Sequence, residues 1–323
     1  MDDSFFFGSA LAAIETQLEK IIAADRRSQG LLPPVLIEGE TGTGKTTLAR
    51  WLHRRGPRAT EPLVELNCSA LPEALAESEL FGHERGAFTD AKEARIGLLE
   101  AAEGGTLFLD ELPSLSLGIQ AKLLKAIEDR TIRRVGGNRM LSIDARIVAA
   151  TNADLRELVA AGRFREDLLH RLDLFRLRIP PLRERGNDIV PLAERLIARI
   201  AKNYGLTPET IPPEGRERLL AHRWPGNVRE LAHEVERSLV FAEDNLAFTS
   251  LGSVGAHSNQ AKETWVSSQF QIAEGFSLEA AIDGIIARAL EQAGGNVSAA
   301  ARLLGVTRDY IRYRRGEKAV GER

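Results

Sequence analysis

The stretch VLIEGETGTGKTTLAR, residues 35–50, carries the strongest structural signal in the chain. Its apolar run Val35-Leu36-Ile37 predicts a short buried strand that ends at Gly39, and a helix is expected from about Lys45 to Arg54. Between them lies the pattern G-x-x-x-x-G-K-[ST], whose glycines let backbone N–H groups converge on phosphate oxygens at a helix N-terminus. Strand, loop and helix in this order predict a nucleotide site on an α/β sheet.

Two side chains of this loop have specific expected contacts. Lys45 can reach the β and γ phosphates of ATP, and the Thr46 hydroxyl is a ligand of the kind that Mg²⁺ accepts. We therefore expect ATP and Mg²⁺ as cofactors. The residues expected to hold them are Gly39, Glu40, Thr41, Gly42, Thr43, Gly44, Lys45, Thr46 and Thr47.

Strands and helices alternate on both sides of this loop. Apolar residues recur at helical spacing over 10–22, and the further segments expected as strands are 63–67, 105–111 and 145–152. Helices are expected between and after them, at 72–81, 119–129 and 165–172. Alternation of this kind predicts an α/β fold in which helices cover both faces of a parallel sheet.

The pattern changes after the α/β core. About three helices, broken at TPETIPPEG and WPGN, indicate a separate all-helical subdomain, and a stretch rich in Ser, Gly, Asn and Gln indicates a linker. A small helical domain follows. We predict the boundaries 1–185 for the core, 186–242 for the helical subdomain, 243–275 for the linker and 276–323 for the last domain.

Polar residues follow two of the predicted strands. Leu107-Phe108-Leu109 delivers Asp110 and Glu111 to the carboxyl end of the sheet, where open α/β sheets bind ligands. Asp110 is expected to hold Mg²⁺ and Glu111 to polarise the water that attacks the γ-phosphate. Thr151 and Asn152 end the next strand, where an amide could sense the γ-phosphate or cap a turn.

Residues 162–185 are rich in arginine. Most arginines in such a run are solvated or paired with acids, but phosphoryl transfer without an arginine finger is slow, and a neighbouring subunit can supply the finger. The arginines are Arg163, Arg165, Arg171, Arg176, Arg178, Arg183 and Arg185.

The C-terminal segment GGNVSAAARLLGVTRDYIRYRR predicts a helix-turn-helix, with its turn at Gly305. Residues 302–318 carry a net charge of +4, in a chain whose net charge is −3. A helix that binds double-stranded DNA explains this cluster better than a solvated helical face. The expected DNA-binding residues are Thr307, Arg308, Tyr310, Arg312, Arg314 and Arg315.

Composition limits where the protein acts. Cys68 is the only cysteine of the 323 residues, so no intrachain disulfide can form, and the cytoplasm is the expected location. No apolar run approaches the ~18 residues of a membrane span. Phe5-Phe6-Phe7 follows two aspartates and lacks the basic flank of a signal peptide. We expect no contact with a membrane.

One short segment continues neither the helical nor the strand period of apolar residues. Gly86-Ala87-Phe88-Thr89-Asp90-Ala91 sets a phenylalanine between small residues, whereas a core phenylalanine belongs to a periodic apolar face. This segment belongs to a series of nine sequence motifs. In chain order they are GETGTGK, LNCSAL, ESELFGHERGAFTDA, GGTLFLDE, RVGG, ATNADL, FREDLLHRL, PPLRER and WPGNVREL. With these motifs the chain resembles the bacterial enhancer-binding proteins, the sigma-54-dependent transcription activators among the AAA+ ATPases, from Gly8 to about Phe241, with a Fis-like helix-turn-helix at 276–315.

The resemblance implies a function for each motif. The fold would be an AAA+ P-loop NTPase core with a helical lid, and the partners would be sigma-54 RNA polymerase holoenzyme and DNA upstream of the promoter. ATP hydrolysis in a hexameric ring would drive the loop Gly86–Ala91 against sigma-54. Asn67 would pair with Glu111 as a switch, Thr151 and Asn152 would be a first sensor, and Arg229 a second. Arg165 and Arg171 would reach into the neighbouring subunit's site.

The chain departs from the family pattern at Asp90, which stands where the family's loop has its second glycine. Asp90 adds a charge and restricts φ near the loop tip, which favours an alternative: a DNA-binding regulator of the same architecture that does not engage sigma-54. An AAA+ loader or helicase-type motor is a further alternative, against which Phe88 and the single helix-turn-helix argue. About thirty residues precede the P-loop core, so we expect no N-terminal regulatory domain and regulation by a trans-acting protein or through expression.

Overall fold

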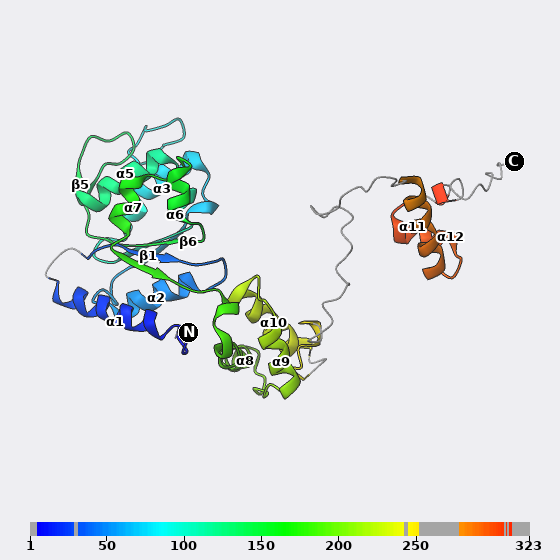
Figure 1. The fold of residues 1–323 in the computed structure, drawn as a ribbon. Coiled ribbons are helices and arrows are strands. Elements are labelled where there is room, and N and C mark those ends of the chain that lie inside the picture. Colours follow the sequence, from blue (N-terminus) through cyan, green and yellow to red (C-terminus); the bar gives the residue numbers. More distant parts are fainter. Residues whose placement is uncertain are drawn as a thin grey trace. The chain divides into compact units, whose positions relative to one another are not determined.

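The computed structural model describes residues 5–28, 32–241, 245–251, 278–306, 308, 310 and 311. The chain divides into two compact units, Met1–His257 and Ser258–Arg323. The first unit contains a layered α/β part and a helical bundle (Figure 1).

The α/β part is built on a five-stranded sheet in which all neighbouring strands are parallel. The strand order is β2-β3-β6-β1-β7. The strands are β1 (Val35–Glu38), β2 (Leu63–Asn67), β3 (Thr106–Asp110), β6 (Arg146–Thr151) and β7 (Phe175–Arg178). The predicted parallel sheet is confirmed, and its carboxyl ends share one edge, which brings the P-loop close to Asp110.

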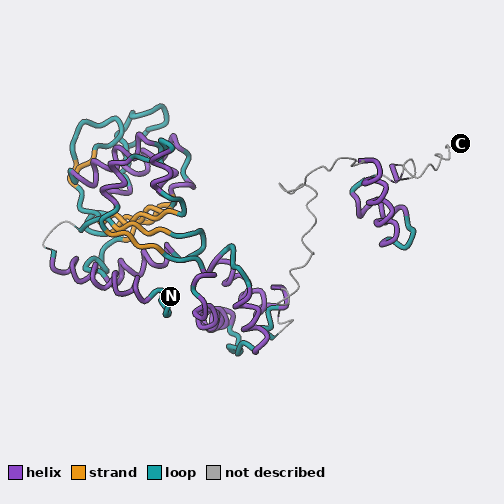
Figure 2. Tube along the Cα trace, viewed as in Figure 1, coloured by secondary structure: helices purple, strands orange, loops and turns teal. Residues whose placement is uncertain are grey.

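Helices cover both faces of the sheet, as predicted (Figures 1 and 2). Successive side chains of a strand point to opposite faces of the sheet, so each face has its own hydrophobic core. In β1, Val35 and Ile37 pack in one core and Leu36 in the other. The helices of the first face are α1 (Ala12–Arg27) and α2 (Lys45–Arg55). Those of the second are α3 (Glu73–Phe81), α4 (Leu98–Ala101), α5 (Leu117–Glu128), α6 (Leu155–Ala160) and α7 (Glu166–Leu172), with short 3₁₀ turns at Cys68–Ala70 and Leu112–Ser114.

Three strands of the described structure were not predicted from the sequence. The edge strand β7 alternates Phe175 and Leu177 with two arginines, and its pairing with β1 is parallel. The prediction treated this segment as part of an arginine-rich run and so missed its period of two. The other two, β4 (Thr131–Ile132) and β5 (Leu141–Ser142), form a two-residue antiparallel ladder too short to give a periodic signal.

The helical bundle is the predicted all-helical subdomain. Its helices are α8 (Ile189–Tyr204), α9 (Pro213–Ala221) and α10 (Asn227–Phe241), preceded by 3₁₀ turns at Leu182–Glu184 and Gly186–Asp188. The core surrounds Trp224, which is fully buried and donates its indole N–H to the carbonyl of Leu219 at 2.9 Å.

Residues 245–251 differ from the expected linker. Leu246 and Phe248 are buried in the core of the helical bundle, and Thr249–Leu251 forms a 3₁₀ turn. Arg218 donates to the carbonyl of Ala247 at 2.6 Å. This part of the chain therefore packs with the bundle, because a pair of apolar residues can be buried without any sustained period. The rest of the predicted linker lies outside the described residues.

The second unit contains α11 (Leu278–Gln292) and α12 (Val297–Leu304). Asn296 caps α12 by accepting the backbone N–H groups of Ser298 and Ala299, and Gly305 turns the chain with φ +63°. A small core joins Ile286, Ala289, Ala300, Ala301 and Ile311.

Two of the expected DNA-binding residues, Arg308 and Tyr310, are exposed. Thr307, Arg312, Arg314 and Arg315 lie outside the described residues. None of the helices among the described residues combines the length and the apolar composition that a bilayer span requires.

Candidate functional site

The loop between β1 and α2 has the conformation that its glycines allow. Gly42 and Gly44 have φ values of +81° and +105°, a region that residues with a Cβ rarely occupy. A Cβ on Gly42 would lie 2.3 Å from the carbonyl oxygen of Gly226. Glycine at position 42 therefore also allows the helical bundle to pack its backbone directly on this loop.

Lys45 lies at the start of α2 and is buried. Its Nζ donates to the carbonyl oxygens of Gly39 and Glu40 at 2.8 and 3.2 Å. Burial lowers the pKa of Lys45, and the negative charges of Glu111 and Asp110 oppose this effect. The ammonium group is thus placed at the centre of the loop, between the backbone and the acidic pair.

Thr46 and Asp110 meet at the carboxyl edge of the sheet. The Thr46 hydroxyl donates to Asp110 Oδ2 at 3.3 Å. Hydroxyl and carboxylate oxygens are hard ligands of the kind that Mg²⁺ prefers, and it usually takes one or two of them from the protein. The side chains present fit a magnesium ion, although the described part of the chain has no cluster of three or more acidic, histidine or cysteine ligands.

Glu111 follows the end of β3 with a left-handed φ of +53°, and its backbone N–H donates to Asp110 Oδ1 at 3.0 Å. Burial raises the pKa of Glu111; Asp110 adds to this effect and the charge of Lys45 opposes it. Asn67 is the in-register neighbour of Asp110, but its side-chain oxygen accepts the N–H and hydroxyl of Ser69. The structure does not bring Asn67 and Glu111 into a hydrogen bond.

Thr151 and Asn152 have different surroundings at the end of β6. Thr151 is fully buried, and its hydroxyl both accepts from the N–H and donates to the carbonyl of Ala153, which makes it a turn cap. Asn152 is exposed and donates its side-chain N–H to Thr41 Oγ1 at 3.1 Å. Only Asn152 has its side chain on the loop.

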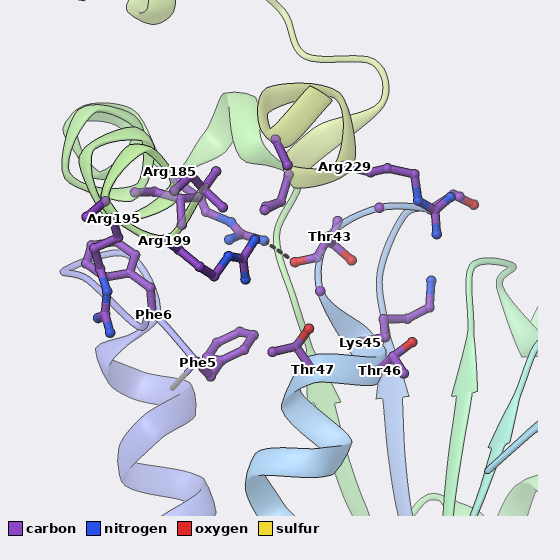
Figure 3. Close-up of a pocket in the computed structure, with 18 of the residues that line it drawn as sticks. Phe5, Phe6, Thr43, Lys45, Thr46, Thr47, Arg185, Arg195, Arg199 and Arg229 are labelled. Atoms are coloured by element: carbon purple, nitrogen blue, oxygen red, sulfur yellow. Dashed lines mark hydrogen bonds between the residues drawn. The ribbon is translucent and has the colours of Figure 1, made fainter. Parts of the chain in front are cut away.

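A cavity of about 930 Å³ opens between the loop and the helical bundle (Figure 3). Its lining combines residues 41–47, Asp110 and Glu111 with Phe5, Phe6 and basic side chains of α8. The N-terminal segment is fixed beside the cavity, because Ser9 and Ala10 donate to Asp188 at 2.9 and 2.6 Å. The cavity is of the size that accommodates a nucleotide or another small ligand.

Three residues that the sequence prediction missed or left without a role attach the bundle to the loop. Asn227 is fully buried with φ +54°; its side chain donates to Glu40 and to the carbonyl of Thr41, and accepts the N–H of Leu182 at 2.7 Å. Arg183 binds both carboxylate oxygens of Glu40, at 2.8 and 2.6 Å. These bonds, from Arg183 first and Asn227 second, lower the pKa of Glu40 to about 2.

Arg185 is the third of these residues, and it donates to the carbonyl of Thr43 at 2.8 Å (Figure 3). The three residues belong to the WPGN and PPLRER motifs, which marked them as candidates for a role. The sequence does not reveal their contacts with the loop, because the motifs approach the loop only in the folded chain. Arg229 lines the cavity and extends from the first turn of α10 across the loop (Figure 3). The backbone N–H groups of Val228 and Arg229 share the carbonyl oxygen of Gly42 as acceptor.

Arg165 and Arg171 are absent from the lining of this cavity. Arg165 forms a double hydrogen bond with Asp167, at 3.0 and 2.7 Å, and its side chain is 40% exposed. Arg171 lies at the end of α7 and is exposed. Neither arginine therefore contributes to the cavity of its own chain.

The segment Gly86–Ala91 forms a tight exposed loop. The backbone N–H of Gly86 donates to the carbonyl of Ala91 at 2.8 Å, and the N–H of Ala91 donates to the carbonyl of Phe88. Ala91 itself is buried. Phe88 is 40% exposed, with its ring 5.0 Å from that of His83. The loop's residue with positive φ is Gly86, at +82°, whereas Asp90 keeps a negative φ. The backbone therefore does not require glycine at position 90.

Three protein families match successive parts of the chain. The sigma-54 interaction domain matches residues 10–178, the AAA+ ATPase lid domain residues 183–264, and the Fis family of bacterial regulatory proteins residues 284–317. The chain belongs to the sigma-54 interaction domain family. The predicted AAA+ core, helical lid and Fis-type helix-turn-helix are confirmed.

The relatives are transcription regulators. The chain is 51% identical over 233 residues to the anaerobic nitric oxide reductase transcription regulator NorR of Salmonella arizonae, covering 72% of this chain and 45% of the relative. With NorR of Citrobacter koseri it is 55% identical over 208 residues, which is 64% of this chain and 41% of the relative. The chain thus spans under half the length of these family members.

Solved structures of NtrX from Brucella abortus share the fold. The structure in complex with ATP has a TM-score of 0.68 and 30% identity, covering 98% of this chain and 70% of that chain. The structure in complex with ADP has a TM-score of 0.67 and 30% identity, covering 97% and 69%.

Proposed function

We propose that this protein is a sigma-54-dependent transcriptional activator, which binds DNA upstream of a promoter and uses ATP hydrolysis to remodel the sigma-54 RNA polymerase closed complex. The observation that carries the proposal is the cavity that joins the loop 41–47, the acidic pair after β3 and Arg229 of the lid within one unit. Membership of the sigma-54 interaction domain family supports it.

ATP is the proposed substrate, supported by the ATP complex of the related NtrX. Backbone N–H groups of the loop and Lys45 would hold the phosphates, and Thr46 and Asp110 would hold Mg²⁺, which neutralises phosphate charge when bound. Glu111 would accept a proton from the attacking water, a role that suits a carboxylate whose pKa burial raises. Asn152 and Arg229 would contact the γ-phosphate as sensors, with Thr151 holding the turn below Asn152.

We propose a hexameric ring because phosphoryl transfer is fast only with an arginine finger, and neither Arg165 nor Arg171 lines the cavity of its own chain. Arg165 and Arg171 would enter the cavity of the neighbouring subunit. Asn67 would act as a switch that pairs with Glu111 in another state of the ring, which requires that it exchange its bonds with Ser69.

The exposed loop Gly86–Ala91 would contact sigma-54. A backbone hydrogen bond between Gly86 and Ala91 joins the two ends of the loop, and Phe88 is exposed between them. The aromatic ring is therefore available to a partner. Asp90 keeps a negative φ, so the loop has this conformation without the family's second glycine. We favour the activator over a regulator that does not engage sigma-54 because the surrounding motif ELFGHERGAFT is intact.

The C-terminal unit would bind double-stranded DNA through Arg308, Tyr310 and the basic residues that follow them. We propose residues 276–323 as the DNA-binding domain, 1–185 as the ATPase core and a lid that extends from 186 to at least 251, because Leu246 and Phe248 belong to its core. The linker would occupy the remaining residues up to 275.

In vitro transcription from a sigma-54 promoter tests the proposal. The protein should produce transcript with ATP and none with a non-hydrolysable analogue. Lys45→Ala should abolish transcript and ATPase activity, whereas Lys20→Ala, at an exposed lysine of α1, should change neither. Transcript formed equally with the analogue would contradict the proposal.

A further inference from the structure

Gln120 is a fully buried polar residue in the first turns of α5. Its Nε2 donates to the carbonyl of Leu115 at 2.8 Å and to that of Arg163 at 3.3 Å. Its Oε1 accepts the backbone N–H of Arg165 at 2.9 Å. One amide therefore connects two segments that are more than forty residues apart in the sequence.

The segment that Gln120 holds is the base of α7. Arg165 is the N-cap residue of this seven-residue helix, so its backbone N–H has no hydrogen-bond partner within the helix and needs one elsewhere. The preceding residues are also constrained, because Gly162 has φ +65° and Phe164 is buried. The Arg165 and Arg171 side chains stay exposed while the backbone beneath them is fixed.

The other end of the connection is the turn after the acidic pair. Leu115 follows Glu111 by four residues, and the N–H of Ser114 donates to the carbonyl of Glu111 at 3.0 Å. Gln120 thus joins the turn beside a subunit's own acidic residues to the base of its finger helix. It is absent from the cavity lining, so it has no direct contact with a nucleotide held there.

We propose that Gln120 is a positioning residue for the arginine fingers: its amide fixes the backbone from which Arg165 and Arg171 enter the neighbouring subunit's cavity. This inference rests on the proposed trans role of these arginines. A displacement of about 1 Å in a catalytic group can cost about 10²-fold in rate. Loss of the amide should therefore lower kcat in the ring and leave the affinity for ATP unchanged.

The first experiment is steady-state ATPase kinetics of the full chain at concentrations that maintain the ring. Gln120→Met keeps the length and volume of the side chain and removes the three hydrogen bonds. It should lower kcat by about 10²-fold with KM within about twofold of wild type. Gln17→Met, at an exposed position of α1, is the matched control and should change neither.

A role in packing alone predicts that methionine substitutes without loss, so an unchanged kcat would overturn the inference. Gln120→Asn is the second variant, for use if methionine lowers the melting temperature of the chain. It keeps an amide that is one methylene too short to span Leu115 and Arg165, and it should lower kcat in the same way.

Mixed rings separate an effect on the neighbour from an effect on the subunit's own site. Lys45→Ala subunits have intact fingers but no working site, and Gln120→Met subunits have an intact site. Mixing the two should restore hydrolysis well above the sum of the separate proteins. The reference mixture is Arg171→Ala with Lys45→Ala.

Recovery in both mixtures supports the inference. Recovery in the reference mixture alone overturns it and leaves the trans role of Arg171 standing, because Gln120 would then act on its own subunit's site. Recovery in neither mixture overturns the trans role and the inference together.

Discussion

Burial gives the acidic residue Glu111 the property that a general base needs. Glu111 has a left-handed φ and lines the same cavity as Lys45, and burial raises its pKa although the charge of Lys45 opposes this effect. The opposite holds for Glu40, whose pKa falls to about 2 because Arg183 and Asn227 bind its carboxylate. Glu40 therefore stays ionised as an anchor for the lid, while the pKa of Glu111 lies above the ordinary value of a glutamate.

The acid side of the pH–rate profile tests the role of Glu111. A base acts when it is deprotonated, so a raised pKa shifts the loss of activity to a higher pH than the ordinary range of glutamate. We expect kcat/KM for ATP to fall on acidification in that region. Glu111→Gln should abolish most activity, and the same acid dependence in its residual rate would show that another group titrates.

At the scale of elements, the sequence predicted those parts that have a period or a local motif. The P-loop, the strand before Asp110 and the lid helices α8 to α10 are of this kind. The edge strand β7 was missed because arginines occupy its alternate positions. Asn227 and Gln120 were missed because their roles arise from backbone groups far away in sequence, which no local pattern encodes.

Phe248 belongs to the lid by its packing, and its loss should destabilise that element. Phe248→Ala removes a fully buried ring and should cost about 3–5 kcal/mol of the unfolding free energy. Phe241→Ala removes a ring that is 66% exposed and should change it by less than about 0.5 kcal/mol. Thermal and denaturant unfolding of both variants measures the difference; equal stability would place residues 245–251 outside the lid core.

The chain as a whole forms two compact units, Met1–His257 and Ser258–Arg323. The first holds the cavity and the exposed loop, and the second holds a small helical core with Arg308 and Tyr310 exposed. Because the units have separate cores, hydrolysis and DNA binding should be separable by mutation.

Removal of residues 276–323 should abolish binding to a specific DNA site and leave ATPase activity at high protein concentration. Within the full chain, Arg308→Ala should weaken DNA binding by about 1–3 kcal/mol if it reads a base, and a smaller salt dependence would instead indicate a phosphate contact. Arg288→Ala, on α11, is the comparison and should have a smaller effect. Gel-shift titrations at several salt concentrations measure both, and unchanged affinity after the deletion would refute this division.

In the proposed mechanism, Phe88 couples ATP turnover to sigma-54. The most direct measurement traps the ring with ADP and aluminium fluoride, a transition-state analogue, and assays co-migration with sigma-54 on a native gel. The wild-type protein and Phe241→Ala should shift sigma-54, while Phe88→Ala should hydrolyse ATP near the normal rate and shift none. A wild-type ring that hydrolyses ATP but forms no trapped complex with sigma-54 would rule out this coupling.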